Sequence, residues 1–448
     1  MRKYLHLFKT TSEFENVYNG EGYKEPWVSY TKDSGTVKYN KTEQEKPLTF
    51  KITSDGDIKW KARNASSTRE IQYSKNSGEW TTITSTTGGT SISVVAGDVV
   101  KFKSTAFPGR DSTFSGTTAG FSLEGNIMSL GGGDGFASLT EITQIFAFSD
   151  QFRSCTGLTD ANKLVLPATT LTKNCYAGMF GGCTSLVTAP ELPATTLAEN
   201  CYDDMFGGCT SLVTSPELPA TTLAENCYDD MFGGCTSLVT APELPATTLA
   251  DYCYTRMFEG CTSLTTAPAL PATTLADNCY ASMFIGCTSL TAAPELPATT
   301  LADYCYGSMF LSCISLTTAP ALPATTLADY CYNNMFNGCT SLATAPALPA
   351  TTLANYCYNG MFNACTSLTA APELPATTLA DNCYIYMFAG CRSLNYIKCL
   401  ATDISASNCT ANWAVDVAST GTFVKAASMS SWSTGVNGIP TNWAVQDA

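Results

Sequence analysis

The chain has 448 residues but only one histidine, His6, and basic side chains are scarce after its first third. Because no other histidine is present, the rest of the chain cannot use histidine as a catalytic base or metal ligand. Residues 1–150 carry 17 basic and 17 acidic side chains, whereas residues 151–448 carry 7 and 21. The net charge of −14 therefore lies in the second region, and it argues against nucleic acid and anionic membranes as partners.

Long apolar runs are also missing from the sequence. No stretch approaches the length of a transmembrane helix, so we expect no membrane insertion. The first residues lack the apolar segment of a secretory signal, and no cysteine lies near them for lipid attachment. We therefore expect a protein that is used without export, or that leaves the cell by another route such as lysis.

More than half of the chain is a tandem repeat of 26 residues. Each unit reads Leu-Pro-Ala-Thr-Thr-Leu-Ala-Asp/Glu-Asn/Tyr-Cys-Tyr-x-x-Met-Phe-x-Gly-Cys-Thr-Ser-Leu-x-x-Ala-Pro-x. Its first cysteine recurs from Cys175 to Cys383 and, in a degenerate unit, at Cys409. A fixed period of this length predicts stacked units that form a solenoid, and such arrays present long binding surfaces.

All 21 cysteines lie between Cys155 and Cys409. Each stands where a small apolar residue fits a solenoid interior, which favours ladders of buried thiols. Disulfides between equivalent cysteines of neighbouring units are the alternative, because a coil spacing of ~5 Å is within the range of a bridge. A zinc site is disfavoured by the absence of a Cys-x2-Cys pair, and we expect no cofactor.

Within one unit, Thr196 and Glu199 have the spacing of a helix capping box, which recurs along the array. The pattern predicts a short helix over residues 197–206, with its apolar side turned inward. Residues 212–215 are predicted as a short parallel strand that ends at Pro216. The recurring acidic position forms a line of like charges that would also suit a divalent cation, but capping already accounts for it.

The rest of the chain divides into an N-terminal arm at residues 1–45, an all-β region at 46–130 and a C-terminal cap at 399–448. Alternating apolar residues predict a small β-sandwich with hairpin turns at 76–78 and 96–98. In the arm we expect short strands at 26–30 and 36–39, and in the cap a final strand at 421–425. The arm is alternatively the first part of the β region. Residues 131–135, which are rich in glycine, predict a flexible joint at the start of the solenoid of residues 131–398.

The phrase Met-Phe-x-Gly-Cys-Thr-Ser-Leu, followed by a short strand and Leu-Pro, resembles the BspA-type leucine-rich repeats of gut bacteria, from Phe148 to about Leu400. The resemblance implies a leucine-rich-repeat solenoid whose units are a short helix plus a short parallel strand. It implies surface adhesion or recognition rather than catalysis. The 26-residue length and the Ala-Pro strand depart from the family pattern, so the curvature need not match other members.

Two further resemblances concern the N-terminal region. The β region resembles the domain that often precedes such arrays in Bacteroides and its phages. The opening Lys3-Tyr4-Leu5-x-Leu7-Phe8, with Val37-Lys38-Tyr39-Asn40 further on, is similar to the start of structural proteins of phages that infect Bacteroides. This similarity implies that the arm docks on a virus particle through Tyr4, Leu5, Leu7, Phe8, Trp27 and Tyr30.

The near-identical units differ mainly at the two residues before the methionine and the one after the phenylalanine. These positions predict a ligand-binding edge, whereas unconstrained surface variation is the alternative; apolar residues on an exposed edge favour the first. The predicted binding residues are Thr255, Arg256, Glu259, Ile285, Leu311, Asn333, Asn334, Asn337, Asn359, Asn363, Ile385 and Tyr386.

No nucleophile–base pair, phosphate-binding loop or nucleotide-binding motif stands out, so we expect no enzymatic activity. The sequence therefore predicts a bacteriophage virion protein of the fibre or receptor-binding type. Its arm would contact other virion proteins, and its array would recognise a host surface glycan or protein. A BspA-like adhesin on a bacterial cell surface and a purely structural capsid or tail decoration are the alternatives. The sequence leaves a homo-oligomer open.

Overall fold

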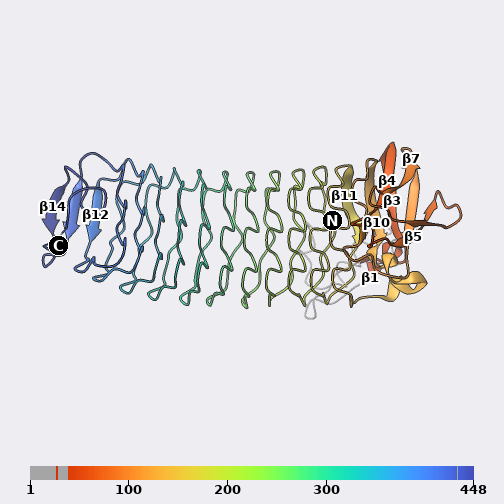
Figure 1. Ribbon diagram of the computed structural model, residues 1–448, viewed down its shortest axis with the longest axis horizontal. Coiled ribbons are helices and arrows are strands. Elements are labelled where there is room, and N and C mark those ends of the chain that lie inside the picture. The colour runs from red at the N-terminus through yellow and green to blue at the C-terminus, as the bar shows by residue number, and fades with distance from the viewer. Residues whose placement is uncertain (1–26, 29–38, 431) are drawn as a thin grey trace, which may run out of the picture.

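The computed structural model describes residues 27–28, 39–430 and 432–448. It shows a β-sheet region at one end, a long row of stacked coils, and a small sheet at the other end (Figure 1). The elements are β1 (Trp27–Val28), β2 (Tyr39–Asn40), α2 (Lys41–Gln44), β3 (Leu48–Ser54), β4 (Gly56–Ala62), β5 (Glu70–Lys75), β6 (Thr81–Thr84), β7 (Thr90–Val94), β8 (Val99–Lys103), β9 (Ser112–Thr113), β10 (Gly120–Asn126), η3 (Ile127–Leu130), η4 (Gly133–Ser138), β11 (Leu158–Val165), β12 (Tyr396–Cys399), β13 (Thr422–Lys425) and β14 (Ala444–Asp447).

The β-sheet region consists of a six-stranded sheet in the order β11-β10-β3-β8-β5-β6 and a three-stranded sheet in the order β7-β4-β9. Alternate residues of β3 are directed into the core, where the Phe50 ring lies 4.6 Å from that of Phe121 and 5.1 Å from that of Phe102. The predicted hairpin at 76–78 is confirmed, because β5 and β6 pair antiparallel. The predicted hairpin at 96–98 is wrong, because β7 pairs with β4 whereas β8 pairs with β3 and β5.

The glycine-rich segment 131–135 is not a flexible joint, as the sequence suggested. It follows η3 and runs into η4, and the Phe107 ring leaves no room for a side chain at Gly131. The sheet also continues past it, since β11 pairs in parallel with β10 while Asp160 of β11 bridges to Thr188 of the next coil. The β-sheet region therefore extends to β11 and shares one hydrophobic core with the array.

The short helix predicted in each unit is also wrong. The backbone makes consecutive turns over residues 199–208 instead. Every fourth residue is left-handed: φ is 54° at Asn200, 52° at Asp204 and 71° at Gly208. A left-handed residue interrupts the hydrogen-bond ladder of an α-helix, so no helix propagates through these positions. The same three positions are left-handed in most coils.

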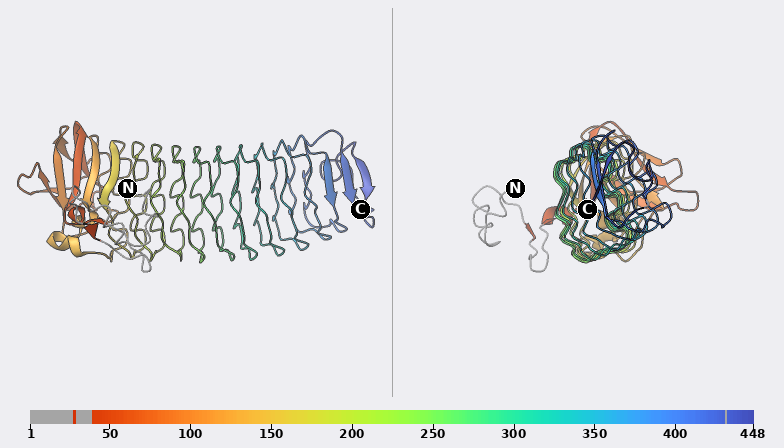
Figure 2. Two further views of the ribbon diagram at one scale, coloured as in Figure 1. Left: turned by 180° about the vertical axis from the view of Figure 1, so that it is seen from behind. Right: turned by 90° about the vertical axis from the view of Figure 1, so that its left-hand side faces the viewer.

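The turns divide the backbone amides between two partners. Tyr202 N–H donates to the carbonyl of Cys227 in the next coil at 3.0 Å, whereas Met205 N–H donates to Tyr202 within its own coil at 3.2 Å. Alternate amides along the segment follow the same division. Half of the backbone amides in this segment thus donate to the next coil along the solenoid axis, as amides do in a parallel sheet. The coils nearly superpose when viewed along that axis (Figure 2).

The recurring acidic residue serves the neighbouring coil rather than its own. Asp277 N–H donates to Asp251 Oδ1 at 3.1 Å, and Asp303 N–H donates to Asp277 Oδ1 at 3.1 Å. In these units with aspartate, the predicted capping box is therefore corrected to a cap between coils. Like a helix cap, it provides an acceptor for an amide that would otherwise lack one.

The predicted strand of each unit is reduced to one bridging residue. Thr188, Thr214, Thr240 and Thr266 are joined by isolated parallel bridges from coil to coil. A proline follows each bridge two residues later and has no N–H to extend the ladder. A second line of bridges, such as Thr170 with Thr196, was not predicted.

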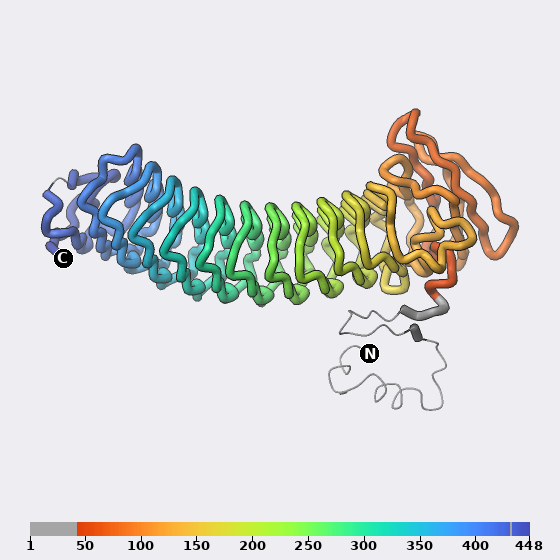
Figure 3. The backbone as a smooth tube through the Cα atoms, turned by 90° about the horizontal axis from the view of Figure 1, so that it is seen from below, coloured from red at the N-terminus to blue at the C-terminus, as the bar shows by residue number. Residues whose placement is uncertain are grey.

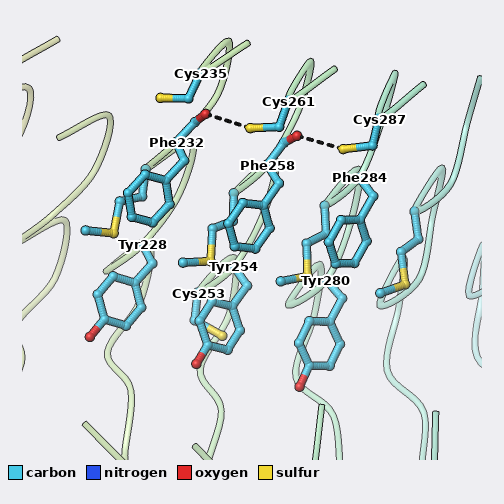
Figure 4. Close-up of a cluster of buried hydrophobic side chains, with 14 of the residues drawn as sticks. Tyr228, Phe232, Cys235, Cys253, Tyr254, Phe258, Cys261, Tyr280, Phe284 and Cys287 are labelled. Atoms are coloured by element: carbon cyan, nitrogen blue, oxygen red, sulfur yellow. Dashed lines mark hydrogen bonds between the residues drawn. The ribbon is translucent and has the colours of Figure 1, made fainter. Parts of the chain in front are cut away.

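Tyrosine, phenylalanine and cysteine form continuous ladders inside the array (Figure 4). The Phe258 ring lies 5.7 Å from that of Phe232 and 5.6 Å from that of Phe284. Each second cysteine donates its thiol to a phenylalanine carbonyl in the preceding coil, as Cys261 does to Phe232 at 3.1 Å. All 21 cysteines are buried and free, as the thiol-ladder interpretation expected, and burial raises the pKa of Cys261 to about 12.

The C-terminal sheet closes the open end of the array. The strands β12, β13 and β14 pair in parallel, and β13 matches the predicted final strand, whereas β14 after it was not predicted. The buried Trp413 ring stacks on the last interior tyrosine, Tyr384, at 6.2 Å and on Trp432 at 5.7 Å. The row of coils between the two ends bends along its length (Figure 3).

Candidate binding surface

The predicted binding residues all lie at the surface of the array: none of the twelve is buried. Variable positions of adjacent coils are joined by backbone hydrogen bonds. Ser308 N–H donates to the carbonyl of Asn333, and Asn334 N–H donates to that of Asn359, both at 2.7 Å. The side chains of Asn333 and Asn334 are hydrogen-bonded to each other at 2.8 Å. The variable positions therefore form continuous lines along the solenoid.

A line of surface tyrosines runs beside these positions and was missed in the sequence. Tyr252, Tyr304, Tyr330 and Tyr356 occupy the residue before the first cysteine, where the other regular units have asparagine. The ring of Tyr330 stacks on that of Tyr304 at 4.2 Å and on that of Tyr356 at 4.3 Å. The alternation between asparagine and tyrosine in the repeat was the available signal.

The backbone conformation at these positions is unfavourable for tyrosine. Tyr252 has φ 57° and Tyr304 has φ 56°, close to the φ of 55° at Asn278 in the coil between them. Asparagine tolerates this left-handed conformation better than an aromatic residue, for which it costs about 1–3 kcal/mol. Both tyrosines are nonetheless substantially exposed, at 41% and 39%. Stability of the coil alone does not account for tyrosine at this position.

A depression of about 550 Å³ lies over the coils that contain Tyr252, Asn278 and Tyr304. It brings three of the predicted binding residues, Thr255, Arg256 and Asn333, to the same place as the two tyrosines. The other nine predicted residues do not line this depression, namely Glu259, Ile285, Leu311, Asn334, Asn337, Asn359, Asn363, Ile385 and Tyr386. One part of the predicted edge is therefore a concave, partly aromatic surface.

The polar side of the depression is organised by an ion pair. Arg256 donates through Nη2 to both carboxylate oxygens of Asp229, at 3.1 and 3.2 Å. The hydrogen bond to Asp229 raises the pKa of Arg256 above its usual value, so the guanidinium stays charged. Thr255 donates from its hydroxyl to the carbonyl of Asn278 at 2.7 Å. These contacts hold donors and acceptors in place before any ligand binds.

Carboxylates crowd the coils next to the depression. Burial, together with the neighbouring carboxylates, raises the pKa of Asp203 to about 7. The same causes raise the pKa of Asp230 to about 6, whereas Arg256 lowers it. The positively charged Arg153 binds Asp204 at 2.7 Å on the other side of this cluster. The cluster makes this part of the array unfavourable for anions near neutral pH.

The raised pKa of Asp203 leads to a prediction about pH. Because the folded pKa lies above the ordinary value of 3.8, the stability contributed by the protonated form is present at acidic pH and is lost as pH rises through about 7. Replacing Asp203 with asparagine is expected to raise the melting temperature at pH 8 by a few degrees while leaving it nearly unchanged at pH 4. Differential scanning calorimetry between these pH values measures the effect.

Glu243→Gln is the matched control, because it removes the same charge from an exposed position of a neighbouring coil. Its melting temperature should follow that of the wild-type protein at every pH. Parallel pH curves for Asp203→Asn and the wild type would contradict the prediction.

A second depression, of about 450 Å³, is lined by alanine, leucine and proline side chains, including Pro320, Leu322 and Pro346. It offers no polar side chain to orient a ligand, which binding sites for small molecules generally provide. Among the described residues, no three histidine, cysteine or acidic side chains are placed to hold a metal ion. The described part of the chain also contains no helix of the length and apolarity needed to cross a membrane.

The predicted docking residues of the arm are only partly covered by the structure. Trp27 lies in β1, which pairs antiparallel with β2, close to the short strands expected at 26–30 and 36–39. The other docking residues lie outside the described part of the chain, namely Tyr4, Leu5, Leu7, Phe8 and Tyr30.

The protein was compared with protein families, with characterised proteins and with solved structures. No family model matches the chain, and neither a curated protein nor a solved structure matches it significantly.

Proposed function

We propose that this protein is a non-enzymatic bacteriophage virion protein of the fibre or receptor-binding type, whose array recognises a ligand on the host cell surface. The observation that carries the recognition part is the line of surface tyrosines beside a concave polar surface, in which Tyr252 and Tyr304 are exposed and kept in a strained conformation. Exposed aromatic rings beside fixed polar groups are typical of binding surfaces.

The contrast between interior and surface supports the same proposal. The interior of every regular coil is built from the same tyrosine, methionine, phenylalanine and cysteine, all buried. The twelve variable residues predicted to bind a ligand lie at the surface, and none of them is buried in this core. A rigid array of this kind holds surface side chains in fixed relative positions, so little entropy is lost on binding. This arrangement suits recognition better than catalysis.

We propose that the two N-terminal sheets form a small sandwich that spaces the array from the particle. In this proposal, residues 1–45 contact other virion proteins. The array is related to BspA-type leucine-rich repeats, although its coils are built from turns where that pattern has a short helix. A BspA-like adhesin on a bacterial cell surface is the second candidate, favoured by the same exposed tyrosines.

The first experiment asks where the protein is found. Mass spectrometry of density-purified phage particles and of host outer-membrane fractions would search both for its peptides. Stoichiometric recovery with the particles is expected. Recovery in host membranes alone would overturn the virion proposal and leave the adhesin.

The second experiment asks what the array does. Deleting residues 227–382 removes whole 26-residue units, so the remaining coils join in register and both ends of the solenoid are kept. Particles that carry this deletion are expected to assemble normally, and their adsorption to host cells is expected to fall about tenfold or more. Normal adsorption would show instead that the array is a structural decoration.

A further inference from the structure

The line of surface tyrosines is interrupted at one coil. Tyr304, Tyr330 and Tyr356 form a closed stack in which neighbouring rings lie 4.2 and 4.3 Å apart. In the next coil toward the N-terminus, Asn278 takes the place of a tyrosine, and Tyr252 follows in the coil beyond it. Tyr252, Asn278 and Tyr304 all line the depression of about 550 Å³. The smaller asparagine thus leaves an open space between two aromatic residues.

The size of this space can be compared with that of a ring. Tyr252 and Tyr304 are two coils apart. Tyrosine rings at this position in successive coils stack 4.2 and 4.3 Å apart, so a separation of two coils is roughly 8–10 Å. A ring held between two aromatic side chains needs two van der Waals contacts of ~3.5–4 Å each, or roughly 7–8 Å. The space therefore admits one six-membered ring and not two.

The polar groups around the space suit the edges of a sugar. Arg256 and Asp229 present a paired donor and acceptor, with contacts of 3.1–3.3 Å between them. Ser308 and Asn333 add hydroxyl and amide groups to the lining. A pyranose ring has apolar C–H faces that pack on aromatic rings and hydroxyl groups around its rim. Its two kinds of surface match the two kinds of lining residue.

The charge of the site selects among sugars. Asp203 and Asp204 lie in the coil next to the depression and Asp230 follows Asp229 of its lining, and residues 151–448 carry all of the chain's net charge of −14. The one guanidinium that lines the depression, that of Arg256, is already bound by Asp229. A sulfated, phosphorylated or carboxylated sugar would therefore be repelled.

We propose that the cleft between Tyr252 and Tyr304 binds one pyranose ring of a neutral glycan. The inference rests on the proposed function, because it names the ligand class and the place of host recognition. Tyr252 and Tyr304 contact the two faces of the sugar ring, and Arg256 and Asp229 bind its hydroxyl groups.

Asn278→Tyr is the decisive variant, because it extends the tyrosine stack through the cleft and removes none of the lining tyrosines. Tyrosine already occupies the same left-handed position in four coils, so the variant is expected to fold. Tyr356→Ala is the matched control: it removes an aromatic ring from the same line outside the depression. Thermal melting of both full-length variants confirms folding before binding is measured.

Saturation-transfer NMR on the full-length protein provides the measurement. The probes are the methyl glycosides of glucose, galactose, mannose and N-acetylglucosamine, with N-acetylphenylalanine amide as a peptide-like probe. We expect transfer to at least one glycoside in the wild type, weakened about tenfold or more by Asn278→Tyr and unchanged by Tyr356→Ala. Absence of transfer to every glycoside, or equal binding by Asn278→Tyr, would overturn the proposal. Transfer to the amide alone would point to a protein ligand and would overturn it as well.

The two experiments distinguish an error in the cleft proposal from an error in the proposed function. If deletion of residues 227–382 abolishes adsorption while Asn278→Tyr particles adsorb normally, the array recognises the host elsewhere and the cleft proposal is wrong. If the deletion leaves adsorption unchanged, the proposed function is wrong. The NMR result on the isolated protein then still decides whether the cleft binds a sugar.

Discussion

Replacing Phe258 with alanine is expected to lower the free energy of unfolding by about 3–5 kcal/mol, the usual cost of emptying a buried phenylalanine site. The side chain is fully buried between Phe232 and Phe284, with ring centroids 5.7 and 5.6 Å away (Figure 4). Its backbone carbonyl accepts the thiol of Cys287 at 3.1 Å, so the residue is tied to the next coil in two ways. The neighbouring ladders on both sides limit how far the cavity can collapse.

Urea unfolding followed by circular dichroism measures this loss. Because each coil contacts mainly its neighbours, a defect in the middle of the array weakens the coupling between its two halves. The unfolding transition is therefore expected to become broader or to split. The apparent free energy of unfolding is expected to fall less steeply with urea concentration. Val239→Ala is the control, since this valine is 44% exposed and its truncation should change stability little. A single sharp transition at the wild-type midpoint for Phe258→Ala would contradict the prediction.

Replacing Trp413 with alanine is expected to cost a similar ~3–5 kcal/mol, but at one end of the molecule. Trp413 is fully buried, stacks on Tyr384 at 6.2 Å and donates from its indole N–H to the carbonyl of Gly438 at 2.8 Å. It connects the interior tyrosine ladder to Trp432 of the C-terminal cap, whose ring stacks on it at 5.7 Å. Without it, the end of the array faces solvent, and terminal coils without a cap fray.

Hydrogen exchange read by mass spectrometry localises this effect. Amides in the coils from Cys383 onward are expected to lose protection in Trp413→Ala, while those near Cys201 keep it. Val445→Ala in β14 is the control, because this side chain is 48% exposed and lies in the same sheet as the cap strands. Equal loss of protection along the whole array, or no loss anywhere, would show that Trp413 does not act as an end cap.

The solenoid and its interior could be predicted because they depend on periodicity. A buried position in one coil is a buried position in the next, so the 26-residue period places Cys201, Met205 and Cys209 in the core without knowledge of the backbone. The burial of the cysteines follows from the same argument, whereas the sequence left disulfides between coils open. The twelve variable positions were expected at the surface for the complementary reason, and the structure places them there.

The path of the backbone within a coil could not be predicted in this way. Thr196 and Glu199 carry a local helix-start signal, but such a signal is read within one chain segment. In the folded molecule the amides have a second set of partners in the adjacent coil, and left-handed residues such as Asn200 and Asp204 direct them there. Hydrogen bonds between coils outweighed the local preference for a helix.

Repetition in the sequence was enough to establish a stacked array with a constant interior and a variable exterior, because burial at an equivalent position recurs with the period. Contacts between coils decided the rest. Whether an aspartate caps its own turn or that of its neighbour depends on which amide lies opposite. Likewise, the exchange of tyrosine for asparagine at residue 278 became meaningful only once stacking had brought Tyr252 and Tyr304 to either side of it, since side chains 26 residues apart meet only in the folded solenoid.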